Sequence, residues 1–150
     1  MFTFKCIYYL GSSCDPGWTR FARNGACYKY FSSQKSWSGA HSSCRALGGD
    51  LASVTDLSTN EFLTTLTTAR AWIGGRRNSD GTWGTWTDGT PWCYTRWYPG
   101  EPNNNKYAEG SSFSSEDRLM INIGIKRYGA KPGFWNDLAS GRTYGYICQK

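Results

Sequence analysis

The chain has 150 residues, which fits one domain around a single core, and 17 Lys and Arg against 11 Asp and Glu give it a net charge of +6. The basic residues stand singly or in pairs such as Arg76-Arg77 and Lys126-Arg127, so there is no basic stripe and nucleic-acid binding is not expected. No apolar run approaches the length of a membrane span, so membrane insertion is not expected either.

The cysteine pattern indicates an oxidising environment. The six cysteines are Cys6, Cys14, Cys27, Cys44, Cys93 and Cys148. They include no Cys-x-x-Cys pair and the chain has one histidine, His41, so disulfides are a better interpretation than a structural zinc site. Disulfides favour a secreted, extracellular protein. The opening residues, MFTFKCIYYLG, are too short and interrupted for a secretory signal, so we expect any export signal to have been removed already.

The chain begins with an N-terminal extension over residues 1–13, followed by a predicted hairpin. Residues 14–31 alternate aromatic with polar side chains around a turn, which predicts two short strands. A bond between Cys14 and Cys27 would close this hairpin.

Two amphipathic helices are expected next. The first is predicted from residues at helical spacing, which are Trp37, Ala40, Cys44 and Leu47. Gly48-Gly49 is its stop signal. In the second, Ser58 and Glu61 form a capping box, so this helix is expected to begin near residue 59.

The second half of the chain has shorter strand signals. Strands are expected in AWIGG at residues 71–75, RLMINIGI at 118–125 and YGYICQK at 144–150, while GTWGTWTDGTPW at 81–92 alternates aromatic with turn residues. The stretch from Cys93 to Asp137 otherwise has little periodicity, and irregular segments this long are usually functional. It contains WYPGEPNNNKY at 97–107, where a Glu and three Asn gather side-chain oxygens around Gly and Pro.

Seven short motifs follow one another in a recognisable order. They are Cys-x-x-Gly-Trp at 14–18, Cys-Tyr at 27–28, a helix ending in Cys44, Trp-Ile-Gly at 72–74, Glu-Pro-Asn at 101–103, Trp-Asn-Asp at 135–137 and Ile-Cys at 147–148. Together they resemble a long-form C-type lectin-like domain over residues 14–149, and the predicted domain is therefore 14–150. The resemblance implies an α+β fold with two helices, twisted antiparallel sheets and a long loop region that binds calcium and sugar. It also implies the disulfides Cys14–Cys27 and Cys44–Cys148.

The resemblance assigns calcium ligands to two of these motifs. In sugar-binding members the first and third residues of Glu-Pro-Asn and the last two of Trp-Asn-Asp bind the ion, which here are Glu101, Asn103, Asn136 and Asp137. Calcium takes six to eight oxygen ligands at about 2.3–2.6 Å from carboxylates and amide carbonyls, so the residue types suit it. A cis bond before Pro102 would point the oxygens of Glu101 and Asn103 the same way.

A fifth calcium ligand has two candidates. The family places a Glu before an Asp-Cys pair, and SSEDRLM has Glu116-Asp117 there, so Glu116 is preferred. Glu109 is the alternative because it is closer to the Glu-Pro-Asn turn in sequence. A secondary calcium site from Asp80, Asn104 and Asp117 has less support, and we expect these to be ordinary surface residues.

The same five residues are expected to bind sugar. Two vicinal hydroxyls contact the ion, the carboxylates accept hydrogen bonds from them, and the amide nitrogens of Asn103 and Asn136 donate to them. In the family, Glu-Pro-Asn goes with equatorial 3- and 4-hydroxyls, as in mannose, glucose, N-acetylglucosamine and fucose. The expected partners are therefore mannose-type glycans of microbial or cell surfaces. Tyr98 or Tyr107 could stack on the sugar.

The chain departs from the family pattern at its cysteines. The third family disulfide would join the positions of Arg118 and Ser140, so both of its cysteines are absent. Cys6 and Cys93 lie outside the pattern. Either they pair with each other and tie the extension to the loop, or Cys6 pairs across chains in a homodimer and leaves Cys93 free.

Calcium-dependent carbohydrate binding is the predicted function. The alternative is a structural, protein-binding or ice-binding lectin-like domain, although most such members lose the carboxylates that this chain keeps. An enzyme is not expected. Glu101 and Glu116 could form an acid and base pair for glycoside cleavage but are better used as metal ligands. GRTYG at 141–145 imitates a nucleophile elbow, but His41 is far away in sequence.

Overall fold

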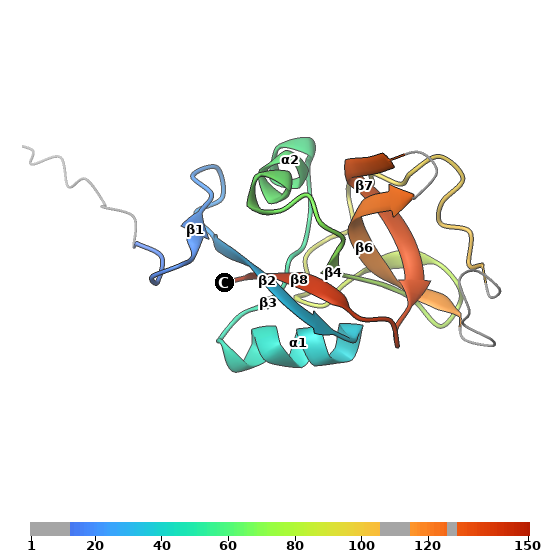
Figure 1. The fold of residues 1–150 in the computed structure, drawn as a ribbon, viewed down its shortest axis with the longest axis horizontal. Coiled ribbons are helices and arrows are strands. Elements are labelled where there is room, and N and C mark those ends of the chain that lie inside the picture. Colours follow the sequence, from blue (N-terminus) through green and yellow to red (C-terminus); the bar gives the residue numbers. More distant parts are fainter. Residues whose placement is uncertain (1–12, 106–114, 126–128) are drawn as a thin grey trace, which may run out of the picture.

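The computed structural model describes residues 13–105, 115–125 and 129–150. These residues form the predicted α+β fold, in which a sheet separates two helices (Figure 1). In Figure 1, α1 (Trp37–Ala46) lies below the central strands and α2 (Leu57–Leu66) lies above them. Among the described residues, no helix is long and apolar enough to cross a membrane.

One mixed sheet organises the chain. Its strands are β1 (Thr19–Arg20), β2 (Cys27–Lys35), β3 (Asp50–Leu51), β4 (Ala71–Arg77), β5 (Trp83–Trp86), β6 (Glu116–Ile125), β7 (Gly129–Ala139) and β8 (Tyr144–Gln149). Hydrogen bonds join them in the order β1-β2-β8-β4-β6-β7, with β3 beside β8 and β5 beside β4. The pair β4 and β8 is parallel, and the other pairs are antiparallel. Because β2 pairs with β8, the beginning and the end of the domain are neighbours.

Helix α1 follows the sequence prediction except at its last turn. Its buried residues are Trp37, Ala40 and Cys44. Leu47, expected on the same face, is 43% exposed, so that part of the prediction is wrong. The helix has already ended there: Leu47 is the C-cap, and Gly48 adopts the left-handed φ of 80° that commonly terminates helices.

Helix α2 begins earlier than predicted, because its cap is a different residue. The carboxylate of Asp56 accepts a hydrogen bond from the N–H of Thr59 at 2.7 Å, which makes Asp56 the N-cap and starts the helix at Leu57. The capping box expected at Ser58 and Glu61 is therefore wrong, since both residues lie inside the helix. Aspartate is among the best N-cap residues, and its negative charge suits a helix N-terminus.

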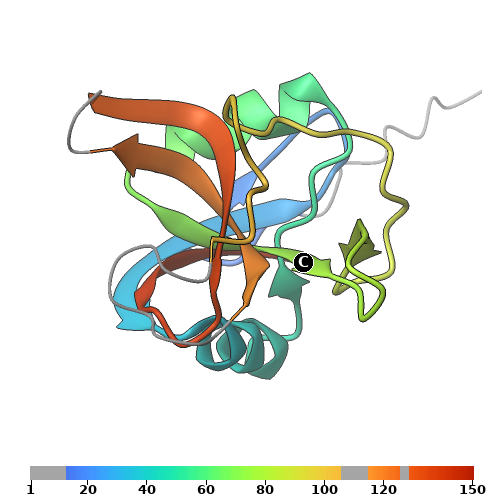
Figure 2. The ribbon, with the colours of Figure 1, turned by 90° about the vertical axis from the view of Figure 1, so that its right-hand side faces the viewer.

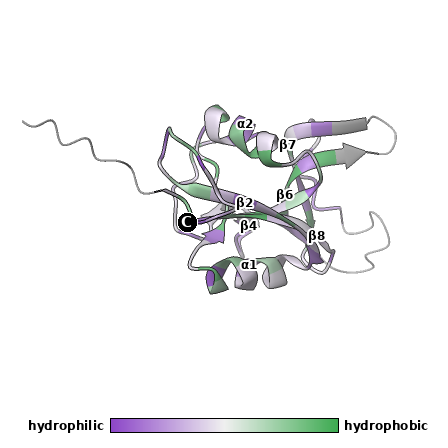
Figure 3. Ribbon diagram, turned by 60° about the vertical axis from the view of Figure 1, so that its left-hand side comes forward, coloured by the Kyte–Doolittle hydropathy of each residue, from purple (hydrophilic) through white to green (hydrophobic). Residues whose placement is uncertain are grey.

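Each helix covers an apolar cluster on its side of the sheet. The cluster under α2 includes Leu63 and the indoles of Trp86 and Trp135, and the cluster under α1 includes Trp37 and Trp72. Figure 3 shows hydrophilic and hydrophobic residues alternating along both helices, as this one-sided burial requires.

Two disulfides fasten the described chain. They are Cys14–Cys27, at the start of β2, and Cys44–Cys148, which joins α1 to β8. These are the pairs that the family resemblance implies. Cys93 is exposed and forms no disulfide with a described residue, while Cys6 lies outside the described residues.

The expected strand RLMINIGI is part of β6, but β7 is not evident in the sequence pattern. β7 pairs along β6 in an antiparallel hairpin, with an irregular register between Ile121 and Ile123. Asn122 lies at this point with a left-handed φ of 65°. Its amide donates to two carbonyls in the segment after α2 and accepts from the N–H of Gly133 at 2.8 Å. This bulge bends the hairpin and ties it to the end of α2.

Candidate functional site

The segment after β5 runs around the outside of the domain and returns beside β7 (Figure 2). Trp135 of β7 fastens it with two backbone hydrogen bonds. The N–H of Trp135 donates to the carbonyl of Arg96 at 2.8 Å, and the carbonyl of Trp135 accepts from the N–H of Tyr98 at 2.9 Å. The loop that follows Tyr98 is thereby held against the strand that carries Asn136 and Asp137.

Asn60 holds the Trp135 side chain from the opposite direction. This α2 residue is 2% exposed, and its Oδ1 accepts from the indole N–H of Trp135 at 2.8 Å. Its Nδ2 donates to the carbonyl of Gly133 at 2.9 Å. Both polar ends of one buried amide are therefore used on β7, immediately before Asn136 and Asp137.

A tight turn then presents the Glu-Pro-Asn motif. The N–H of Glu101 donates to the carbonyl of Tyr98 at 2.8 Å, and Gly100 has a φ of 92°, as the third residue of a type II turn requires. The Glu101–Pro102 bond is cis. The Nδ2 of Asn103 donates to the Oε1 of Glu101 at 3.1 Å, so the two side chains on either side of Pro102 lie together.

Asp137 joins the strand to this loop. It is fully buried, and its two carboxylate oxygens accept from successive backbone N–H groups, from Asn103 at 3.1 Å and from Asn104 at 2.8 Å. The carboxylate of Asp137 therefore lies directly against the backbone of the Glu-Pro-Asn motif.

Glu116 reaches the same loop from β6. Its Oε2 accepts from the N–H of Asn105 at 2.6 Å, and its own N–H donates to the Oδ1 of Asn104 at 3.1 Å. Glu116 is 4% exposed. Glu109, the alternative fifth ligand, lies outside the described residues.

The carboxylates of this site influence one another. Burial of the Glu101 carboxyl, together with the neighbouring carboxylates of Asp137 and Glu116, raises the pKa of Glu101 from 4.5 to about 8. Two oxygens here, Oε2 of Glu101 and Oδ1 of Asn136, are buried and accept no hydrogen bond from the described residues. Buried oxygens without a donor destabilise a fold unless something else satisfies them.

A hard cation suits this donor set. Carboxylates and amide oxygens are the ligands calcium prefers, and a divalent charge would relieve the repulsion that raises the pKa of Glu101. In the described part of the chain, no three carboxylate, imidazole or thiol groups converge as a metal cluster. The donor set is instead mixed, with the amides of Asn103 and Asn136 alternating with carboxylates. The residues present fit calcium.

Comparison with known proteins places the chain in a family. The model of the Lectin C-type domain matches residues 33–150. The chain belongs to the C-type lectin domain family. Members of this family bind carbohydrate rather than catalyse reactions, so the expectation that the chain is not an enzyme is confirmed.

Individual relatives agree with this assignment. A lectin from Pleurodeles waltl is 31% identical over 93% of this chain and 77% of its own length. The secretory phospholipase A2 receptor of Homo sapiens is 32% identical over 91% of this chain, which spans only 9% of the receptor.

Solved structures show the same fold. The carbohydrate-recognition domain of cow CD23, determined in the presence of a GlcNAc2Man3 oligosaccharide, has a TM-score of 0.73 and 28% identity, with 92% of this chain and 95% of that chain covered. A calcium-independent type II antifreeze protein has a TM-score of 0.74 and 27% identity, with 92% and 94% covered.

The three residues considered for a secondary calcium site each have another partner in this lectin domain. Asp80 accepts from the N–H and the hydroxyl of Thr82, and Asp117 forms an ion pair with Arg118 at 2.9 Å. Asn104 bonds to Glu116 of the main site. Each of the three residues therefore has a partner within the protein, although the buried Oδ1 of Asp117 accepts no hydrogen bond from the described residues.

Arg118 stands where the family resemblance implies a cysteine of a third disulfide. Its guanidinium carbon lies 4.7 Å from the ring centre of Trp37, and Trp37 in turn donates its backbone N–H to the carbonyl of Ser140 at 3.1 Å. Arg118 and Ser140 thus both contact Trp37, which links the start of α1 to β6 and to the end of β7. Noncovalent contacts connect the two positions that lack cysteines.

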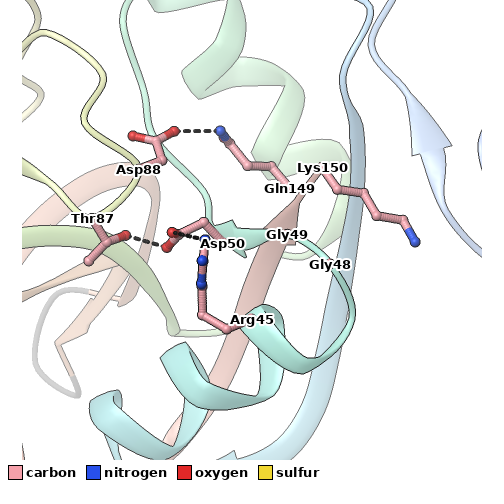
Figure 4. Close-up of a pocket in the computed structure, with 8 residues that line it drawn as sticks. All are labelled: Arg45, Gly48, Gly49, Asp50, Thr87, Asp88, Gln149 and Lys150. Carbon is pink, nitrogen blue, oxygen red and sulfur yellow. Dashed lines mark hydrogen bonds and ion pairs between the residues drawn. The ribbon is translucent and has the colours of Figure 1, made fainter.

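A separate polar pocket of about 310 Å³ is lined by none of the residues predicted to bind calcium. Its lining residues are Arg45, Gly48, Gly49, Asp50, Thr87, Asp88, Gln149 and Lys150 (Figure 4). In Figure 4, Asp88 points to the amide of Gln149, while Asp50 contacts Thr87 and Arg45. Asp50 also lies 3.1 Å from the Nε2 of His41, which explains the half-buried histidine. The carboxylates here are used within the protein.

Sequence reasoning missed Asn60 as part of the site. Its signal is weak but present: Asn60 stands three residues before the buried Leu63, so an amide occupies the apolar face of α2. A polar residue on such a face needs a buried partner. Its partner, the indole of Trp135, is 75 residues away in sequence and could not be identified without the structure.

Proposed function

We propose that residues 14–150 form a calcium-dependent carbohydrate-binding domain, with Glu101, Asn103, Glu116, Asn136 and Asp137 as ligands of the ion. The observation that carries the proposal is the pair of buried oxygens without hydrogen-bond donors, on Glu101 and Asn136. They lie on the two motifs that Trp135 and Asp137 bring together. Calcium ligation would satisfy both oxygens, and it favours the ionised form of Glu101.

The protein's own groups orient the sugar. Bound calcium would supply the positive charge that attracts two vicinal hydroxyl oxygens. Glu101 and Glu116 accept hydrogen bonds from those hydroxyls, and the amides of Asn103 and Asn136 donate to them. Because the family resemblance associates Glu-Pro-Asn with equatorial 3- and 4-hydroxyls, we propose a preference for mannose-configured sugars.

The disulfides also indicate where the domain acts. We propose that the domain is secreted and binds glycans outside the cell, since its two disulfides persist in oxidising compartments. The CD23 domain determined with an oligosaccharide supports glycans as partners of this fold. A homodimer linked through Cys6 remains a proposal that peptide mapping under non-reducing conditions tests.

Ice binding is the second candidate function. It is favoured by one observation, the TM-score of 0.74 with a calcium-independent type II antifreeze protein. A calcium-dependent type II antifreeze protein has the same fold, with a TM-score of 0.71, so the carboxylates near Glu101 do not by themselves decide between sugar and ice. Thermal hysteresis of the purified chain in calcium tests ice binding directly, and its absence beside retention on mannose resin favours sugar binding.

The proposed function is tested by retention on mannose resin and competition with free sugars. We expect retention in calcium, release by chelator, and release by mannose at lower concentration than by galactose. Retention that persists in chelator would contradict calcium dependence. More efficient release by galactose would contradict the sugar preference alone.

A further inference from the structure

Three side chains form an aromatic and cationic ridge beside the proposed sugar site. The Cζ atom of Arg96 lies 4.7 Å from the ring centre of Phe134. The ring of Tyr98 meets Phe134 edge to face, with centres 5.9 Å apart and planes at 85°. Arg96 is exposed, and Tyr98 and Phe134 are partly exposed. We call these residues the Arg96–Phe134–Tyr98 ridge.

The ridge lies close to the proposed calcium ligands, both along the turn at residues 98–101 and along β7. Tyr98 and Glu101 are the two ends of one tight turn, joined by a hydrogen bond of 2.8 Å, so their Cα atoms lie within about 7 Å. Phe134 is two residues before Asn136 on β7, which places both on the same face, roughly 7 Å apart along the strand. A second ring linked to a monosaccharide at the calcium ligands can therefore extend as far as the ridge.

Arg96 has charge available for a ligand. No ion pair joins Arg96 to a carboxylate among the described residues, and Phe134 covers one face of its guanidinium. Arg96 also interacts with the Tyr94 hydroxyl, and the remaining N–H groups of its guanidinium can donate to an oxyanion. Arg96 therefore resembles a preformed anion contact more than a structural ion pair.

An acidic ligand needs such a cation at this place. With calcium bound, the three carboxylates of Glu101, Glu116 and Asp137 still exceed the charge of the ion by one unit, which disfavours a carboxylate or sulfate on a neighbouring ring. Arg96 offsets that repulsion where a second ring would lie. The net charge of +6 also attracts acidic glycans over a longer range.

We propose that the Arg96–Phe134–Tyr98 ridge is a second sugar subsite, which accepts a carboxylate- or sulfate-bearing ring linked to the sugar in the primary site. Tyr98 contacts the apolar face of that ring, Arg96 donates hydrogen bonds to its anionic group, and Phe134 fixes the guanidinium. The inference rests on the proposed function and names the class of glycan, an acidic oligosaccharide with a mannose-type terminal ring.

The test compares ligands that share one terminal mannose. Titration calorimetry in calcium uses methyl mannoside and three disaccharides in which mannose is linked to glucose, to glucuronic acid or to glucose 6-sulfate. We expect at least one acidic disaccharide to bind roughly threefold to fivefold more tightly than the neutral one, the range of an exposed charge pair. The carboxylate and sulfate arms show which group Arg96 accepts.

Two arginine variants separate a local contact from the overall charge. Arg96→Gln should abolish the preference for the acidic ring and leave methyl mannoside affinity unchanged. Arg20→Gln makes the same change of charge on β1, at the opposite edge of the sheet, and should keep the preference. Phe134→Leu should reduce the preference as well, because it frees the guanidinium.

Each outcome decides the proposal. Equal affinity for all three disaccharides, with normal methyl mannoside binding, overturns the subsite but not the proposed function. Equal loss of preference in Arg96→Gln and Arg20→Gln also overturns the subsite, since the effect is then general electrostatics. Failure of methyl mannoside itself to bind in calcium overturns both proposals.

Discussion

At the residue scale, the fold and the proposed calcium ion favour opposite protonation states of Glu101. Burial and the nearby carboxylates of Asp137 and Glu116 favour its neutral acid, whose pKa is about 8. Calcium ligation requires the ionised form. Metal affinity should therefore increase with pH up to about 8, well above the range of an ordinary glutamate with a pKa of 4.5.

We predict that the calcium-free domain loses stability as pH rises through this window. The fold keeps a proton on Glu101 between pH 4.5 and about 8 that the unfolded chain releases, so each increase in pH there favours unfolding. The stabilisation from the neutral acid is complete below 4.5 and lost above about 8. Thermal melting in chelator across this range measures the effect.

The variant Glu101→Gln is the matched control for that prediction. Glutamine has the shape of the neutral acid and cannot ionise, so the decline of Tm between pH 6 and 9 should become smaller in chelator. An identical pH dependence in the variant and in the wild type would contradict the assignment to Glu101.

At the scale of elements, substitutions at the start of α2 test which residue is its N-cap. Asp56→Ala should destabilise the domain by about 1 kcal/mol, because the N–H of Thr59 loses its acceptor. Ser58→Ala should have little effect, although Ser58 stands where the sequence predicted the cap. Chemical denaturation of both variants decides between them, and a larger loss in Ser58→Ala would contradict the observed cap.

Asn60 couples α2 to the proposed site. We predict that Asn60→Ala destabilises the domain by about 1–3 kcal/mol, because the indole N–H of Trp135 and the carbonyl of Gly133 lose their buried partner. It should also lower calcium affinity, since Trp135 fastens the loop at Arg96 and Tyr98.

A second substitution at Asn60 separates its two hydrogen bonds. Asn60→Asp can still accept from Trp135 but cannot donate to Gly133 when ionised. Under conditions where both variants are folded, we expect Asn60→Asp to bind calcium more tightly than Asn60→Ala. Calcium titration measures the difference. Full calcium affinity in Asn60→Ala would show that Asn60 serves stability alone.

Elements with strong local signals were predictable from the sequence, and those defined by distant partners were not. The spacing of Trp37, Ala40 and Cys44 gave α1, because one helical face must be buried. β7 was missed, because Pro132 and Gly133 interrupt its alternation at the point where its register against β6 shifts. The motifs identified the proposed ligands, but Trp135 and Asn60 meet only through the folded chain.

At the scale of the whole molecule, the two disulfides should differ in their contribution to stability. Cys44–Cys148 spans 104 residues and Cys14–Cys27 spans 13. By the chain-entropy model their loss costs about 4–5 and about 3 kcal/mol respectively. We predict that a variant with both Cys44→Ala and Cys148→Ala unfolds at lower denaturant than one with Cys14→Ser and Cys27→Ser. The reverse order would contradict the model for this fold.

The most direct measurement for the whole account is a calorimetric calcium titration of the purified chain at pH 7, performed in two buffers with different heats of ionisation. We predict saturable binding to one site with release of roughly one proton, because Glu101, with a pKa of about 8, must ionise to bind the metal. Glu101→Gln should lose both the binding and the proton release. Absence of saturable binding in the wild type, or binding that Glu101→Gln leaves unchanged, would contradict the calcium site.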